Sequence, residues 1–154
     1  MIARIQSLYL LLVAALAVGS MFFPFWSFSA GHVFLVHDLL PPALDDQIIS
    51  ATSFSGRLFS PLTAIAATSS VLLFKNRELQ SRLIFLAILF FLGDLFSGLT
   101  AAHFMNEHFK TVSLAATHHP EAGFFMLLPE PVFLLMALKG VKTDEKIANA
   151  YKRL

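Results

Sequence analysis

Four long apolar runs constrain the fold of this chain more than any other feature of its sequence. They cover residues 5–26, 54–74, 83–104 and 122–138. A helix of about 20 residues is long enough to cross the hydrocarbon core of a bilayer. Only the last run, at 17 residues, is short for that purpose. We therefore predict four membrane-spanning helices joined by polar connections.

The composition agrees with a membrane protein. Of 154 residues, 56% are hydrophobic and 14% are charged, and the mean hydropathy of +0.71 lies well above that of ordinary soluble domains. Four spans leave no room for a separate soluble enzyme domain. The absence of cysteine excludes disulfides and thiolate metal sites. The predicted fold is an all-α integral membrane four-helix bundle over residues 1–140, with a tail over residues 141–154.

The basic residues predict how the bundle is oriented. Nine of the 11 Lys and Arg residues fall at the N-terminus, in the turn at residues 75–82 or in the tail, whereas Arg57 and Lys110 fall on the opposite side. Because cytoplasmic connections carry the excess of Lys and Arg, both termini are predicted to be cytoplasmic. Residues 27–56 and 105–121 are then external. Residues 33–40, VFLVHDLL, suit either a short helix or a strand, and periodicity does not decide between them.

The tail has the pattern of a short amphipathic helix. Thr143 resembles a helix N-cap, acidic residues follow it, and basic residues close the segment, which matches the helix dipole. An apolar stripe runs along one side and consists of Ile147, Ala150, Tyr151 and Leu154. We expect this helix to lie on the cytoplasmic membrane surface or to dock on a partner protein.

The two ends of the chain resemble a known family. The chain opens MIARIQ and closes with KTDEKIANAYKRL. It is similar to a domain-of-unknown-function family of small four-span membrane proteins of Gram-negative bacteria, whose members begin M-I-x-R-I-Q and end in a basic K-x-D-E helix. The matching residues are Met1, Ile2, Arg4, Ile5, Gln6, Lys142, Asp144, Glu145, Arg153 and Leu154. The resemblance implies location and topology and supplies no catalytic residues.

Two acids interrupt the apolar runs. Asp94 lies roughly 16 Å and Glu130 roughly 13 Å from the cytoplasmic edges of their spans, given the rise of a helix. An acid at the centre of a membrane helix costs roughly 2.5 to 3.5 kcal/mol, so each needs a partner, a proton or water. Pro129 and Pro131 flank Glu130, which predicts a kink or break there.

Two roles for Asp94 and Glu130 remain open. If their spans are neighbours, the two carboxyl groups could share a proton, as a proton- or ion-coupled carrier would require. In the structural alternative, each acid is protonated and hydrogen-bonded across helices, which fixes the bundle. In both, we expect the acids to face the same interior region, with at least one protonated at neutral pH.

Small residues mark the predicted packing faces of the second and third spans. Helical spacing places Thr63, Ala66, Ala67 and Ser70 together, and places Ser97, Gly98 and Ala101 beside Asp94. Such faces let membrane helices approach closely. The opposite side of the third span is expected to meet lipid through Phe85, Leu89, Phe96 and Leu99.

Histidines and acids gather around the second external connection. A metal site there would draw on His103, His108, His118, His119, Glu107 and Glu121. The five-residue spacing of His103 and His108 differs from that of a helical ligand pair, and adjacent His118 and His119 point in different directions. No recognised metal motif is present, and no cofactor is expected.

The sequence favours a non-enzymatic membrane protein. It contains no nucleophile elbow, phosphate-binding loop, dinucleotide motif or zinc-protease motif, and its basic tail is too short for a nucleic-acid binder. We expect a structural or accessory subunit of a larger assembly in the bacterial inner membrane, in contact with lipid and with other subunits or further copies of itself. The alternative is the carrier that uses Asp94 and Glu130.

Overall fold

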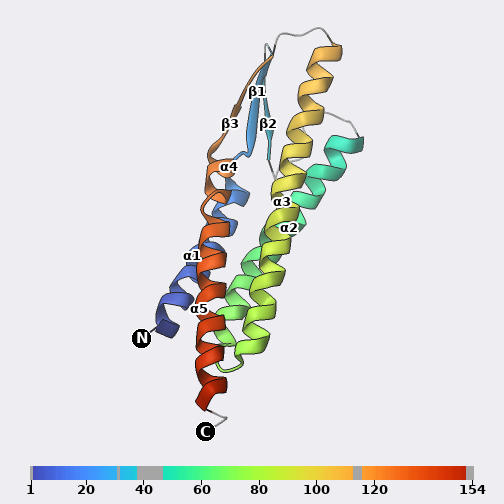
Figure 1. The fold of residues 1–154 in the computed structure, drawn as a ribbon. Coiled ribbons are helices and arrows are strands. Elements are labelled where there is room, and N and C mark those ends of the chain that lie inside the picture. Colours follow the sequence, from blue (N-terminus) through green and yellow to red (C-terminus); the bar gives the residue numbers. More distant parts are fainter. Residues whose placement is uncertain (1, 31, 38–46, 113–115, 152–154) are drawn as a thin grey trace.

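The structure is a computed structural model that describes residues 2–30, 32–37, 47–112 and 116–151. Helices make up most of it, as predicted, and a small sheet accompanies them (Figure 1). In chain order the elements are α1 (Ile2–Phe22), β1 (Trp26–Ala30), β2 (His32–Val36), α2 (Gln47–Leu72), α3 (Arg77–Thr111), β3 (Thr117–Pro120), α4 (Ala122–Leu127) and α5 (Glu130–Tyr151).

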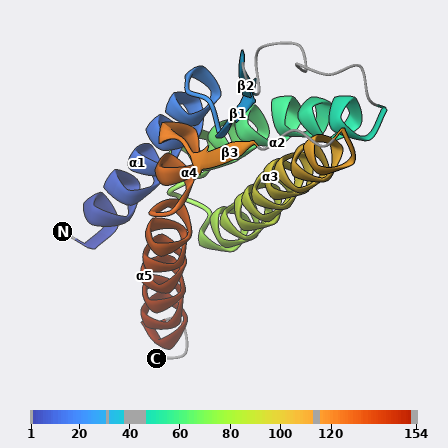
Figure 2. The same ribbon diagram turned by 90° about the horizontal axis from the view of Figure 1, so that it is seen from above.

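The long helices pack side by side in a closed ring. Helix α1 contacts α2, α2 contacts α3, α3 contacts α5, and α5 returns to α1, as the view from above shows (Figure 2). Both termini lie toward the end that holds the turn between α2 and α3, and the sheet lies toward the other end (Figure 1). Asn76 caps α3 within that turn, because its side chain accepts a hydrogen bond from the Leu79 amide at 3.2 Å.

The prediction of an all-α fold is wrong in one respect, because β1, β2 and β3 form an antiparallel sheet in the order β2-β1-β3. Trp26 pairs with Val36 on one side and with Pro120 on the other. The segment from Trp26 to Ser29 alternates aromatic and hydroxyl residues, which is a strand pattern. Of the segment at residues 33–40, Val33 to Val36 lie in β2, and residues 38–40 lie outside the described part.

The first apolar run does not continue as a helix to Trp26. Helix α1 ends at Phe22 because Pro24 lacks an amide donor and disfavours helical backbone at the residue before it. Phe25 instead joins the sheet region, where its amide donates to the Val36 carbonyl at 2.8 Å. Helices α2 and α3 begin before the starts predicted for the second and third spans, at Gln47 and Arg77 respectively.

The predicted break near Glu130 is confirmed. Helix α4 ends at Leu127 and α5 begins at Glu130. The predicted cap at Thr143 is wrong, because α5 runs without interruption to Tyr151. The Thr143 hydroxyl donates to the Lys139 carbonyl at 2.9 Å, a bond within the helix, so the tail is a continuation of α5 and not a separate surface helix.

Gly140 lies where α5 packs closely against α1. Glycine often ends a helix, but here it lies inside α5, and a Cβ at this position would come within 2.7 Å of the Gln6 side chain. Its missing side chain therefore allows α5 to approach α1 closely.

The outer surface is apolar as well as the core, and polar side chains are buried within that largely apolar core. The buried polar residues include Gln6, Ser20, Ser60, Thr63, Ser70, Gln80, Asp94, Ser97 and Glu130. Large apolar side chains lie on the surface, with Leu72 at 74% and Phe96 at 63% exposure. Among the described residues, three helical segments are long and apolar enough to cross a membrane: Ile5–Phe22, Arg77–Thr111 and Ala122–Ala148.

The packing faces of α2 and α3 are as predicted. Thr63, Ala66, Ala67 and Ser70 are all buried, and so are Asp94, Ser97 and Ala101 of α3, whereas Gly98 on the predicted face of α3 is half-buried. The four residues predicted to face outward from α3, Phe85, Leu89, Phe96 and Leu99, are exposed. Helical periodicity therefore identified the inner and outer sides of both helices.

Candidate functional site

Buried polar side chains from four helices lie inside the bundle. We call Ser20, Ser60, Asp94 and Glu130 the central cluster; they come from α1, α2, α3 and α5 respectively. The most exposed of them is Asp94, at 5%. Each long helix of the ring therefore contributes one residue to this cluster.

Asp94 is held by a serine from the neighbouring helix. The Ser60 hydroxyl donates to Asp94 Oδ2 at 2.5 Å, and Ser60 is completely buried. On α3 itself, the Ser97 hydroxyl donates to the backbone carbonyl of Asp94 at 2.9 Å. A close approach of α2 and α3 makes the first bond possible, and Gly93 permits it, because a Cβ there would lie 2.9 Å from the Phe59 ring.

A second hydroxyl extends this contact to α1. Ser20 Oγ lies 3.5 Å from Ser60 Oγ and donates to the Ala17 carbonyl at 2.9 Å. Ser60 donates its one hydroxyl hydrogen to Asp94, and Ser20 donates its own to Ala17. In this arrangement neither serine has a hydrogen left to donate to the other. A protonated Asp94 would reverse the order, donating to Ser60, which could then donate to Ser20.

Glu130 differs from Asp94 in having no hydrogen-bond donor nearby. Its exposure is 0%, and neither carboxyl oxygen has a hydrogen-bond partner among the described residues. Glu130 lies on α5 and Asp94 on α3, and these two helices pack against each other. An unpaired carboxylate in such surroundings is costly, and the neutral acid is the form compatible with this geometry.

A second set of polar residues lies near the chain ends. In this set, which we call the terminal cluster, Gln6 Nε2 donates to Asp144 Oδ2 at 3.1 Å, and Arg77 Nη2 lies 3.4 Å from the same oxygen. Arg77 Nη1 also donates to Gln80 Oε1 at 3.1 Å. The cluster joins α1, α3 and α5, and it brings together one residue from each of the two terminal motifs seen in the sequence.

Sequence reasoning missed the serines of the central cluster and the partners in the terminal cluster. Ser60 lies one turn before Thr63 on the small-residue face of α2, so an extension of that face by one turn would have found it. Gln80 is 1% exposed, yet it stands in a charged turn that the sequence presents as a solvent-facing connection. No local pattern marks it as buried.

The proposed external metal ligands do not converge. No group of three or more His, Asp or Glu side chains that could hold a metal occurs in the described part of the chain. His103 and His118 line the same cavity of about 170 Å³, but the His118 ring packs on Trp26 and Phe28, with centroids 6.0 and 5.7 Å away. The aromatic rings thus account for the position of His118.

The remaining residues of that set have other surroundings. His108 packs edge-on against Phe109, and the backbone carbonyl of His119 accepts a hydrogen bond from Ser27. Glu121 precedes α4 without capping it through its side chain. Lys110 lies 2.7 Å from Glu107, and its hydrogen bond and positive charge lower the pKa of Glu107.

The apolar stripe of the tail is described only in part. Ile147 is 48% exposed, and Ala150 is exposed as well. The side chain of Tyr151 and all of Leu154 lie outside the described residues. The exposed Ile147 side chain is consistent with a surface that lipid or another protein covers.

Together these features define a mostly helical protein with helices able to cross a membrane and with polar groups inside. The chain belongs to the family described as Domain of unknown function (DUF4293), whose model matches residues 2–154. The expected membership of a domain-of-unknown-function family is therefore confirmed. No curated protein and no solved structure matches the chain.

Proposed function

We propose that this protein is a four-span protein of the bacterial inner membrane that serves as a structural or accessory subunit of a larger membrane assembly, without enzymatic activity of its own. The observation that carries the proposal is the apolar outer surface of the long helices, which surrounds a core that also holds buried polar side chains. Such a surface is stable only in lipid or against other apolar surfaces.

Helix α2 is the proposed fourth span. It adds to the three segments whose length and apolar composition allow them to cross a membrane. Its exposed side carries Leu58, Leu62 and Ile65, and it packs between α1 and α3. The exposed Thr68 donates its hydroxyl to the Ala64 carbonyl at 2.8 Å. Because that bond satisfies the hydroxyl within the helix, Thr68 can face lipid.

The proposed orientation places the termini and the turn between α2 and α3 in the cytoplasm. This end carries the terminal cluster and most of the basic residues, as the positive-inside rule requires. The sheet then lies outside. Single cysteines can test this, because the chain has none of its own. A cysteine at Lys146 should resist an impermeant thiol reagent added outside intact cells, and one at Thr117 should react. Labelling of the first would exclude the orientation.

The central cluster suits a structural subunit because its hydroxyls and carboxyls fix how the helices sit against one another. Ser60 and Asp94 join α2 to α3, and Ser20 brings α1 to the same point. Hydrogen bonds across membrane helices stabilise their association by about 1 kcal/mol each. The bundle would thus present a defined apolar outer surface to its neighbours.

Purification under mild conditions tests the proposed role. The full chain, extracted in a gentle detergent, should elute with other membrane proteins in fixed ratio, and Phe96→Ser on the outer face of α3 should release them. Ser97→Ala, on the same helix but buried, is the control and should leave the complex intact. Elution as a homogeneous oligomer of this chain alone would contradict the accessory role.

A second function, a proton-coupled carrier, is favoured by one observation. The Ser20, Ser60 and Asp94 side chains form a chain of exchangeable hydrogen-bond donors that can point in either direction, depending on the protonation of Asp94. Glu130 lies on α5, which packs against the helix that carries Asp94. Vesicles that contain the purified protein should then acidify in response to a proton gradient, and Asp94→Asn should abolish that flux while leaving assembly intact.

A further inference from the structure

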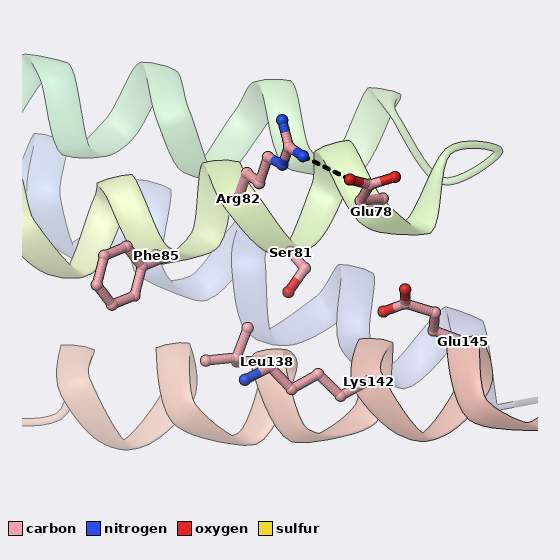
Figure 3. Close-up of a pocket in the computed structure, with 7 residues that line it drawn as sticks. All are labelled: Glu78, Ser81, Arg82, Phe85, Leu138, Lys142 and Glu145. Carbon is pink, nitrogen blue, oxygen red and sulfur yellow. Dashed lines mark hydrogen bonds and ion pairs between the residues drawn. The ribbon is translucent and has the colours of Figure 1, made fainter.

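Three lysines share one face of α5 just beyond its apolar part. Lys139, Lys142 and Lys146 line a groove of about 420 Å³ together with Leu135 and Leu138. A second groove, of about 300 Å³, lies between α3 and α5 and shares Leu138 and Lys142 with the first. Figure 3 shows this second groove, in which the Lys142 side chain lies beside Leu138. The side chains of Leu138 and Lys142 therefore belong to both grooves.

None of these lysines forms an ion pair with another residue in the described part of the chain. Within the described ranges the ion pairs join Arg77 to Asp144, Arg82 to Glu78, and Lys110 to Glu107. The first groove has no acidic residue among its described lining residues. In the second, Glu78 is already paired with Arg82 (Figure 3), and Glu145 is the remaining acid.

An exposed apolar surface adjoins this charge. Leu135 and Phe85, which lie on the side of the grooves toward the middle of the bundle, are each 57% exposed. The lysines begin one turn farther along α5. The apolar surface suits the acyl chains of a lipid, and the adjoining lysines suit its charged headgroup.

We propose that Lys139, Lys142 and Lys146, together with Leu135 and Leu138, bind an anionic phospholipid of the cytoplasmic leaflet. This proposal rests on the proposed orientation in the membrane. The lysine ammonium groups contact the lipid phosphate, and the leucines contact the first part of an acyl chain. A free phosphate would use only the charges, so the apolar part of the groove selects the lipid.

Native mass spectrometry of the full chain in detergent tests this site. We expect the protein to retain phosphatidylglycerol over phosphatidylcholine when both are supplied equally. Each lysine near an anionic headgroup contributes about fivefold in affinity. The triple variant K139Q/K142Q/K146Q should therefore lose the preference, whereas a triple Lys→Arg variant at the same positions should keep it.

A matched pair of single variants separates a local site from general charge. Lys142→Gln removes a groove lysine, and Lys75→Gln removes an exposed lysine in the turn at the same end of the bundle. We expect a reduction of about fivefold in phosphatidylglycerol retention for the first and none for the second. Equal losses would overturn the proposal, because they would indicate a diffuse effect of net charge.

Two further outcomes would also overturn it. Displacement of the lipid by inorganic phosphate would show an anion site without lipid selectivity. Loss of a copurifying protein from the triple variant, with lipid retention unchanged, would show that the lysines bind a protein partner. Whether the triple variant is found in the membrane fraction of cells is measured separately. An unchanged lipid preference in a variant that is still in the membrane would contradict the lipid site alone, whereas absence of the protein from the membrane would contradict the proposed location.

Discussion

The central and terminal clusters both place polar groups inside the bundle, but they compensate charge differently. In the terminal cluster, Asp144 accepts contacts from Gln6 and from Arg77, and the side chains of Asp144 and Arg77 retain 18% and 25% exposure. In the central cluster, Asp94 has a serine partner and Glu130 has no hydrogen-bond partner among the described residues. The difference indicates that the terminal cluster suits charged groups, whereas the central cluster suits neutral ones.

Replacement of Asp94 by alanine should have the largest effect on stability. It leaves the buried Ser60 hydroxyl without its acceptor and opens a cavity, at a cost of about 2 to 3 kcal/mol. The free energy of unfolding in detergent micelles, measured by titration with a denaturing detergent, should fall by that amount. An unchanged value would show that the central cluster does not hold α2 against α3.

Replacement of Asp144 by alanine should cost less, about 1 kcal/mol, because its contacts are partly exposed. The loss should shrink as salt is added, since salt screens the Arg77 interaction. The same unfolding titration at two salt concentrations provides the measurement. A larger loss of unfolding free energy that does not change with salt would contradict this prediction. It would mean that the terminal cluster stabilises the bundle in the same way as the central cluster.

Replacement of Glu130 by glutamine should have the smallest effect, less than about 1 kcal/mol, the usual value of one hydrogen bond. The amide keeps the shape of a neutral acid, so little changes if Glu130 is protonated. Infrared spectroscopy at neutral pH should also show a protonated carboxyl band that this variant loses. Strong destabilisation without such a band would mean that Glu130 is ionised and has a partner.

The helical part of the fold was predictable because its signal is periodic and long. The burial of Thr63 and the exposure of Phe96 follow from helical spacing alone. For β2, a strand was one of two alternatives that the sequence left open, whereas β1 and β3 were missed because their signals are short. The alternation from Trp26 to Ser29 adjoins a long apolar run, and its partner β3, THHP, has no apolar alternation. Their pairing joins residues about 90 positions apart, which no local pattern records.

The candidate site was predictable to the extent that it depends on single residues. Asp94 and Glu130 stand out because acids are rare in apolar runs. Serines are common on packing faces, so Ser20 and Ser60 became distinguishable only when the structure placed them beside Asp94. Similarly, Gln6 and Asp144 lie 138 residues apart in the chain, and only the return of α5 to α1 brings them together.

The central claim is that this is a membrane bundle with an apolar outer surface, in which α2 also crosses the membrane. Spin labels on single cysteines test it, with Ile65 on the exposed side of α2 (61% exposed) and Lys75 in the turn as the water-exposed control. In bilayers, the account predicts that the label at Ile65 is accessible to oxygen dissolved in lipid and shielded from a water-soluble relaxation agent, while the label at Lys75 shows the opposite. A label at Ile65 as accessible to the water-soluble agent as the one at Lys75 would contradict it.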